Sequence, residues 1–188
     1  MEAFLISTLA VAVSEIGDKT QLVALMLAAR FRRPVSIILG ILVATLANHT
    51  LAALAGEWVR TRLPADPLRW GLGLSFLAVA AWTLLPDRID FKARDRGRYG
   101  VFVTAAVAFF LAEMGDKTQI ATAMLAAKYG ALILVVGGTT LGMMIADVPA
   151  VLLGGAAAKK IPLKAVRYAA AAIFALLAVG VLIGYSAP

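Results

Sequence analysis

Six long apolar runs divide this chain, and each has about the length of a transmembrane helix. A helix needs roughly 20 mostly apolar residues to cross a bilayer. Hydrophobic residues make up 62% of the chain and charged residues only 15%, well below the roughly 25% of a soluble domain. We therefore expect an all-α integral membrane protein with six transmembrane helices, at residues of about 3–29, 35–58, 68–85, 100–128, 132–157 and 166–186.

The net charge of +7 does not indicate nucleic-acid binding, because the basic residues lie in short segments between the apolar runs. Twelve of them follow the first, third and fifth runs, and four lie on the other side. Cytoplasmic loops are enriched in Lys and Arg, so the loop at 86–98 is expected to be cytoplasmic. Both termini should then lie on the non-cytoplasmic side of a cell inner (plasma) membrane. The N-terminus lacks a basic leader and a cleavage site, which indicates a retained first span.

The second half of the sequence repeats the first with an offset of 98 residues. Residues 17–21, GDKTQ, return unchanged at 115–119, and residues 26–29, MLAA, return at 124–127. We expect one structural domain built from two three-helix repeats, at 1–85 and 99–188, joined by a linker at 86–98. Because three is an odd number of spans, the second copy enters the membrane from the opposite side. Such inverted repeats are typical of secondary transporters, whose site lies near the midplane between the repeats.

A charged motif lies near the middle of the first span and again in the fourth. On a continuous helix, Glu15, Asp18 and Lys19 would share one face, as would their equivalents in the second copy. Charges are costly in a bilayer, so both sets should point inward, toward each other. The predicted cation ligands are Glu15, Asp18, Gln21, Glu113, Asp116 and Gln119. The predicted supporting residues are Lys19, Thr20, Lys117 and Thr118, with Gly17 and Gly115 as hinges.

This composition indicates an oxygen-rich site for a hard divalent cation. The chain has no cysteine and a single histidine, which excludes thiolate and multi-histidine metal sites. Four carboxylates and two ammonium groups sum to −2, which matches one divalent ion such as Mn²⁺, Ca²⁺ or Mg²⁺. Without the ion, crowded carboxylates repel each other, so at least one should hold a proton. Competition between cation and proton is the physical basis of an antiporter.

Three further polar residues are predicted inside the membrane. Asp147 lies in the fifth span and is expected to line the ion path, although a polar contact at a helix kink is the alternative. Its equivalent in the first repeat is His49, beside Asn48. Both are either part of the path or hydrogen-bond donors between helices. Gly138 and Gly142 are expected to allow close helix packing.

The doubled motif, EIGDKT at 15–20 and EMGDKT at 113–118, resembles that of the transmembrane protein 165 family of cation/proton exchangers. The resemblance covers nearly the whole chain. It implies exchange of Mn²⁺ or Ca²⁺ against protons by the acidic motif residues, with no cofactor. It also implies manganese export, since the bacterial members are associated with that activity.

The sequence thus predicts a secondary active transporter that exports Mn²⁺, and Ca²⁺ as a further substrate, in exchange for protons. Its partners would be the cation, protons and the lipid bilayer, as a monomer or a homodimer. Four alternatives remain: an exporter of another small cation, a channel, an intramembrane enzyme using Asp18 and Lys19, and a structural network. In the structural network, Lys19 would pair with Glu113, and Lys117 with Glu15.

Overall fold

The regular elements of the described residues are all α-helices, as expected. The computed structural model describes residues 1–85, 100–153 and 163–184. The predicted linker at 86–98 and the end of the fifth span lie outside this part of the chain. The helices are α1 (Glu2–Glu15), α2 (Lys19–Phe31), α3 (Pro34–Arg62), α4 (Ala65–Thr83), α5 (Val101–Glu113), α6 (Lys117–Tyr129), α7 (Leu132–Leu153) and α9 (Leu163–Leu182).

Three of the described helices, α3, α7 and α9, are long and apolar enough to cross a membrane. The first and fourth apolar runs each form two shorter helices instead of one, because the charged motif interrupts them. The predicted break at 59–67 is shorter than expected, since α3 continues to Arg62 and α4 begins at Ala65. Basic side chains in the last turn of α3 suit the negative end of its dipole, and Pro64 then prevents the helix from continuing.

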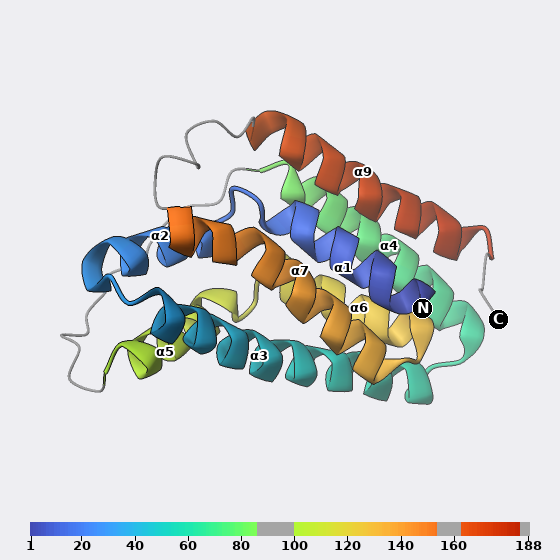
Figure 1. Ribbon diagram of the computed structural model, residues 1–188. Coiled ribbons are helices and arrows are strands. Elements are labelled where there is room, and N and C mark those ends of the chain that lie inside the picture. The colour runs from blue at the N-terminus through green and yellow to red at the C-terminus, as the bar shows by residue number, and fades with distance from the viewer. Residues whose placement is uncertain (86–99, 154–162, 185–188) are drawn as a thin grey trace.

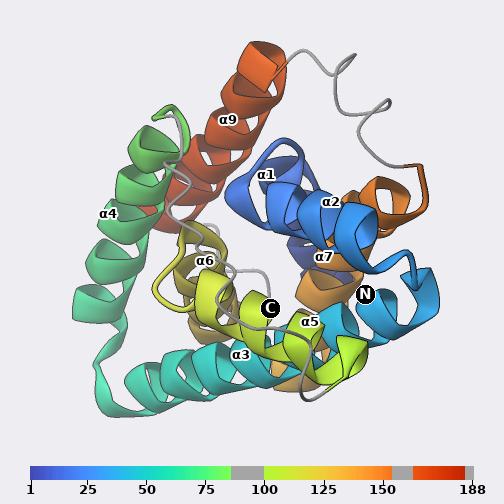
Figure 2. The same cartoon turned by 90° about the vertical axis from the view of Figure 1, so that its left-hand side faces the viewer.

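The long helix of each half packs against the broken pair of the other half. Helix α3 contacts α5 and α6, α7 contacts α1 and α2, and α4 lies along α9 (Figures 1 and 2). A Cβ atom on Gly138 would lie 2.5 Å from the carbonyl oxygen of Phe4, and one on Gly142 would lie 2.6 Å from that of Thr8. These glycines therefore let the α7 backbone approach α1 closely, which confirms the packing expected from the sequence.

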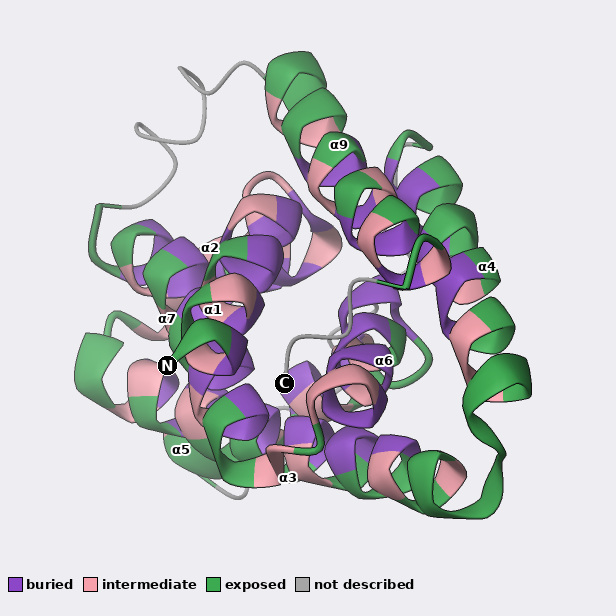
Figure 3. Cartoon of the chain, turned by 90° about the vertical axis from the view of Figure 1, so that its right-hand side faces the viewer, coloured by how far each residue is buried: buried purple, intermediate pink, exposed green. Residues whose placement is uncertain are grey.

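Two apolar clusters lie on either side of the interrupted region. One contains Phe76, Leu125 and Phe174, from α4, α6 and α9. The other contains Ile37, Ile41 and Phe109, from α3 and α5. Figure 3 shows that buried residues face the interior of the bundle and exposed ones face outward. The carboxylates of both motifs are buried within the bundle, away from the outer apolar surface.

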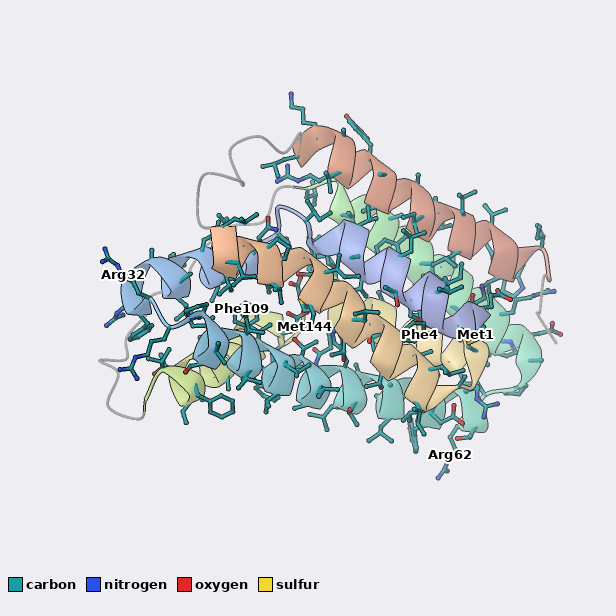
Figure 4. All side chains as sticks on the ribbon, viewed as in Figure 1. Met1, Phe4, Arg32, Arg62, Phe109 and Met144 are labelled. Atoms are coloured by element: carbon teal, nitrogen blue, oxygen red, sulfur yellow. The ribbon has the colours of Figure 1, made fainter. Side chains whose placement is uncertain are left out.

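The loops alternate between two ends of an elongated bundle. Figure 4 places Arg32, between α2 and α3, at one end, and Arg62, at the end of α3, near the other. The N-terminus lies at the Arg62 end (Figure 1). The long axis of the bundle is therefore the direction in which α3 runs from one set of loops to the other.

Candidate cation site

Each charged motif is a break between two helices, and a glycine makes the break. Helix α1 ends at Glu15, Gly17 has a φ of +79°, and α2 begins at Lys19. Gly115 has a φ of +75° at the equivalent break between α5 and α6. A left-handed residue cannot continue a right-handed helix, and glycine adopts this conformation most easily. A helix break thus lies at each predicted hinge glycine, whose role as a hinge stays a prediction, and the charged residues do not share the face of one continuous helix.

The two hinge glycines offer a matched test of the break. We expect Gly17→Ala to destabilise the protein more than Gly115→Ala. Both add left-handed strain of about 1 to 2 kcal/mol, but a Cβ on Gly17 would lie 2.1 Å from Leu163 Cδ2, and one on Gly115 would meet nothing within 4 Å. Thermal unfolding in detergent measures the difference. Adding Leu163→Ala should rescue part of the Gly17→Ala loss, and equal losses in both glycine variants would contradict the assignment.

The two motif glutamates are each held by a threonine of the same motif. Thr20 Oγ1 donates to Oε2 of Glu15, and Thr118 Oγ1 donates to Oε1 of Glu113 at 2.5 Å. The glutamates are 0% and 1% exposed, respectively. Within the described residues, the other oxygen of each carboxyl group has no hydrogen-bond partner. Each glutamate therefore has one oriented oxygen and one that is left for another partner.

The motif aspartates pair with lysines of the opposite half. Lys117 Nζ donates to Asp18 Oδ1 at 2.8 Å, and Lys19 Nζ lies 3.1 Å from Asp116 Oδ2. The pairing of lysine with glutamate, which the structural alternative assumed, is wrong. The reason is the break: each aspartate is the N-cap of the restarted helix and each lysine is its first residue. The glutamates, which lie before the break, bind their own threonines instead.

The motif glutamines hold the breaks against the long helices. Gln21 Oε1 accepts from the Gly17 amide at 2.9 Å, and its Nε2 donates to the Ala146 carbonyl oxygen at 2.9 Å. In the second half, Gln119 Oε1 accepts from the Gly115 amide at 2.7 Å. Each glutamine thus closes the turn made by its own hinge glycine. In this arrangement both amide groups fix the shape of the breaks.

The other predicted polar residues also lie at this site. Asn48 Nδ2 donates to the Phe110 carbonyl oxygen at 2.9 Å, and Gln119 Nε2 lies 3.4 Å from Asn48 Oδ1. Asn48 and Ala146 are separated by the same 98 residues as the two motifs. The glutamine of each motif therefore reaches the same repeat position on the long helix of the other half. His49 and Asp147 follow these positions directly and are both 0% exposed.

The observed arrangement does not group the carboxylates around one point. Among the described residues, no set of three or more histidine, aspartate and glutamate side chains is placed to hold a metal ion. The lysine ammonium groups lie against the aspartates instead. The Glu15 carboxyl group nevertheless interacts electrostatically with those of Glu113, Asp116 and Asp147. The predicted ligand set thus lies in one region, and its role in cation binding remains a prediction.

Apolar helices around a buried, doubled set of charges define a membrane transporter for ions. Comparison with known proteins identifies which kind. A family model described as "Divalent cation/proton antiporter GDT1" matches residues 3–90 and 101–187. The chain therefore belongs to this family, which confirms the family resemblance and the antiporter function predicted from the doubled motif. The two matched ranges begin at residues 3 and 101, which is the offset of the internal repeat.

Two of the relatives that match along nearly the whole chain come from bacteria. A Vibrio cholerae protein named "Putative manganese exporter" is 51% identical over 179 residues, which cover 95% of this chain and 89% of that protein. A Synechocystis protein named "GDT1-like protein sll0615" is 32% identical over 202 residues, which cover 95% of this chain and 96% of that protein. No solved structure matches the chain.

Proposed function

We propose that this antiporter exports Mn²⁺ from the cytoplasm in exchange for protons, at a site between two inverted three-helix repeats. One observation carries the proposal: two buried glutamates, each with an oxygen that lacks a hydrogen-bond partner among the described residues, lie beside two crossed lysine–aspartate pairs. The name of the Vibrio cholerae relative supports Mn²⁺ as the substrate. The predicted ligands are the six carboxylate and amide side chains given above.

Equivalent contacts in the two halves support the inverted repeat. Glu15 and Glu113 each accept from the threonine five residues later. Each lysine pairs with the aspartate of the other motif. A Cβ on Gly40 would lie 2.8 Å from the Phe102 carbonyl oxygen, which is the repeat equivalent of the contact between Gly138 and Phe4. These matched contacts are those expected of a two-fold axis that relates the halves.

The charges of the site explain how a cation and protons compete. In the observed arrangement, Lys19 and Lys117 supply positive charge to Asp116 and Asp18. A divalent ion that binds the carboxylates would replace the ammonium groups as the counter-charge. It would also release protons held by the glutamates, because metal ligands must be deprotonated. Proton binding from the other side would then favour release of the ion.

A small pocket adjoins the site beside the first break. It lies at the first break, beside the end of α4 and the start of α9, and its described lining includes Ser14, Gly17, Asp18, Thr83, Lys117 and Arg167. This is the end that the distribution of basic residues assigns to the cytoplasm. We propose that the cation enters here and meets Asp18 first. Rocking of one repeat against the other would then expose the site to the opposite side.

One observation favours a second candidate function, in which the motif is a structural ion-pair network. The crossed lysine–aspartate pairs join the two halves directly, as such a network would require. The unpartnered glutamate oxygens have no role in that interpretation. A buried polar atom without a partner costs stability, so a purely structural motif gains nothing from retaining them.

A transport assay distinguishes the two functions. Purified protein in liposomes, given a proton gradient, should take up Mn²⁺, and the proton flux should rise with Mn²⁺ concentration. Uptake should stop when a protonophore collapses the gradient, because protons drive the exchange. Equal uptake of Ca²⁺ would broaden the substrate to divalent cations in general. Uptake that ignores the gradient would contradict antiport, and no uptake of either ion would favour the structural network.

A further inference from the structure

The chain's one histidine lies against the carboxyl group of a predicted ligand. His49 Nε2 is 3.9 Å from Glu113 Oε1, and the imidazole is 0% exposed. Within the described residues, neither ring nitrogen has a hydrogen-bond partner. We infer that His49 is a nitrogen ligand of the transported cation and selects Mn²⁺ over Ca²⁺. This inference rests on the proposed function and names a determinant of its specificity.

The separation of the two side chains suits a shared ion. Two atoms that each lie about 2.0 to 2.4 Å from one divalent ion are about 3 to 4.5 Å apart, depending on the angle between them. The 3.9 Å between His49 Nε2 and Glu113 Oε1 falls in this range, and it is too long for a hydrogen bond. Oε1 also accepts from Thr118, while Oε2 of the same carboxyl group has no hydrogen-bond partner among the described residues. An ion bound by both atoms would lie beside the line that joins them.

The position of His49 is fixed by its neighbour. Asn48 Nδ2 donates to the Phe110 carbonyl oxygen at 2.9 Å, and Phe110 lies one helical turn before Glu113 on α5. This hydrogen bond joins α3 to α5 directly beside the contact of the imidazole with the glutamate. The contact is therefore built into the packing of the two helices.

Imidazole changes which ions the site prefers. Ca²⁺ and Mg²⁺ are bound by oxygen ligands, whereas divalent transition-metal ions also accept imidazole nitrogen. A site made only of carboxylate and amide oxygens accepts both Mn²⁺ and Ca²⁺ and has no ligand type that favours the transition-metal ion. A single nitrogen ligand favours Mn²⁺ without creating the multi-histidine environment that suits Zn²⁺.

The two repeats differ at this position, and the difference provides a control. The repeat equivalent of His49 is Asp147, which is also 0% exposed, and neither of its carboxylate oxygens has a hydrogen-bond partner in the described chain. It interacts electrostatically with Glu113 and Asp18. Both Mn²⁺ and Ca²⁺ accept a carboxylate oxygen as a ligand. The first repeat therefore supplies His49, which discriminates between Mn²⁺ and Ca²⁺. The second repeat supplies Asp147, which does not.

The transport test compares His49→Gln with Asp147→Asn in liposomes. We expect His49→Gln to lower the ratio of kcat/KM for Mn²⁺ to that for Ca²⁺ by at least tenfold. Asp147→Asn should reduce transport of both ions and change the ratio by less than about threefold. An unchanged ratio in His49→Gln, or equal losses of both ions, would overturn the inference. If the wild-type protein exchanges neither ion for protons, the proposed function itself fails.

A spectroscopic test does not depend on transport or on the variant folding. Mn²⁺ bound to tag-free wild-type protein should show ¹⁴N modulation from imidazole in electron spin echo envelope measurements. His49 is the only histidine in the sequence, so this signal has a single imidazole source. Bound Mn²⁺ without imidazole nitrogen coupling would overturn the inference, even if Mn²⁺/proton exchange is confirmed.

Discussion

Replacing Glu113 with glutamine should reduce Mn²⁺/proton exchange by about 100-fold or more, because it removes a ligand charge from a low-dielectric site. Glutamine has nearly the same shape, and its amide oxygen can still accept from Thr118 as the Oε1 atom does now. The fold should therefore survive the change. Glu15→Gln should behave in the same way, since Glu15 occupies the equivalent position and accepts from Thr20.

Two control variants separate charge from orientation. Thr118→Val keeps the Glu113 charge but removes the hydroxyl that holds it, so a smaller loss of about tenfold is expected. Glu57→Gln removes a carboxylate that is paired with Arg60 on the surface, and transport should hardly change. The initial rate of Mn²⁺ uptake under a fixed proton gradient measures the activity of Glu113→Gln and of both control variants. Glu113→Gln with activity close to that of Glu57→Gln would refute a role for this glutamate in the site.

Much of the fold follows from the sequence because hydropathy and repetition are strong signals. The apolar runs place the helices to within a few residues, and the unchanged GDKTQ pentapeptide lies at the helix break in both halves. The glycine within it predicts a hinge, since glycine tolerates the left-handed conformation that ends a helix. The close packing at Gly138 and Gly142 can likewise be predicted from the sequence, because small residues four apart form a groove on one helix face.

The partners inside the site do not follow from the sequence. Spacing on an ideal helix places Glu15, Asp18 and Lys19 on one face, but the break at Gly17 turns the glutamate toward its own threonine. The lysines then reach the aspartates of the other half. The contact of His49 with Glu113 is also hidden, because it depends on the register between two helices that are distant in sequence. The sequence pattern predicts which residues lie in the same region of the fold. The tertiary packing determines which of their atoms are in contact.

The two crossed ion pairs should differ strongly in their contribution to stability. Lys117 and Asp18 are almost fully buried, with 4% and 1% of their side chains exposed, whereas the Lys19 side chain is 26% exposed. Removing one partner of a buried pair costs about 3 to 5 kcal/mol, because the other charge stays buried without a counter-charge. In the second pair Asp116 is also buried, at 1% exposed, but the partly exposed Lys19 leaves water closer to that carboxylate. We therefore expect Lys117→Met to lower the free energy of unfolding more than Lys19→Met.

Unfolding by SDS titration in mixed micelles measures both variants, and equal losses would contradict the difference in burial. The double variant Asp18→Asn with Lys117→Met should recover part of the stability, because removing both members of the pair leaves neither charge facing a neutralised partner. Transport then separates the two functions of the motif. If the pair is only structural, the recovered double variant should also recover Mn²⁺/proton exchange. If Asp18 binds the cation, the double variant should be stable and inactive, because stability depends on the balance of charge and transport depends on the carboxylate itself.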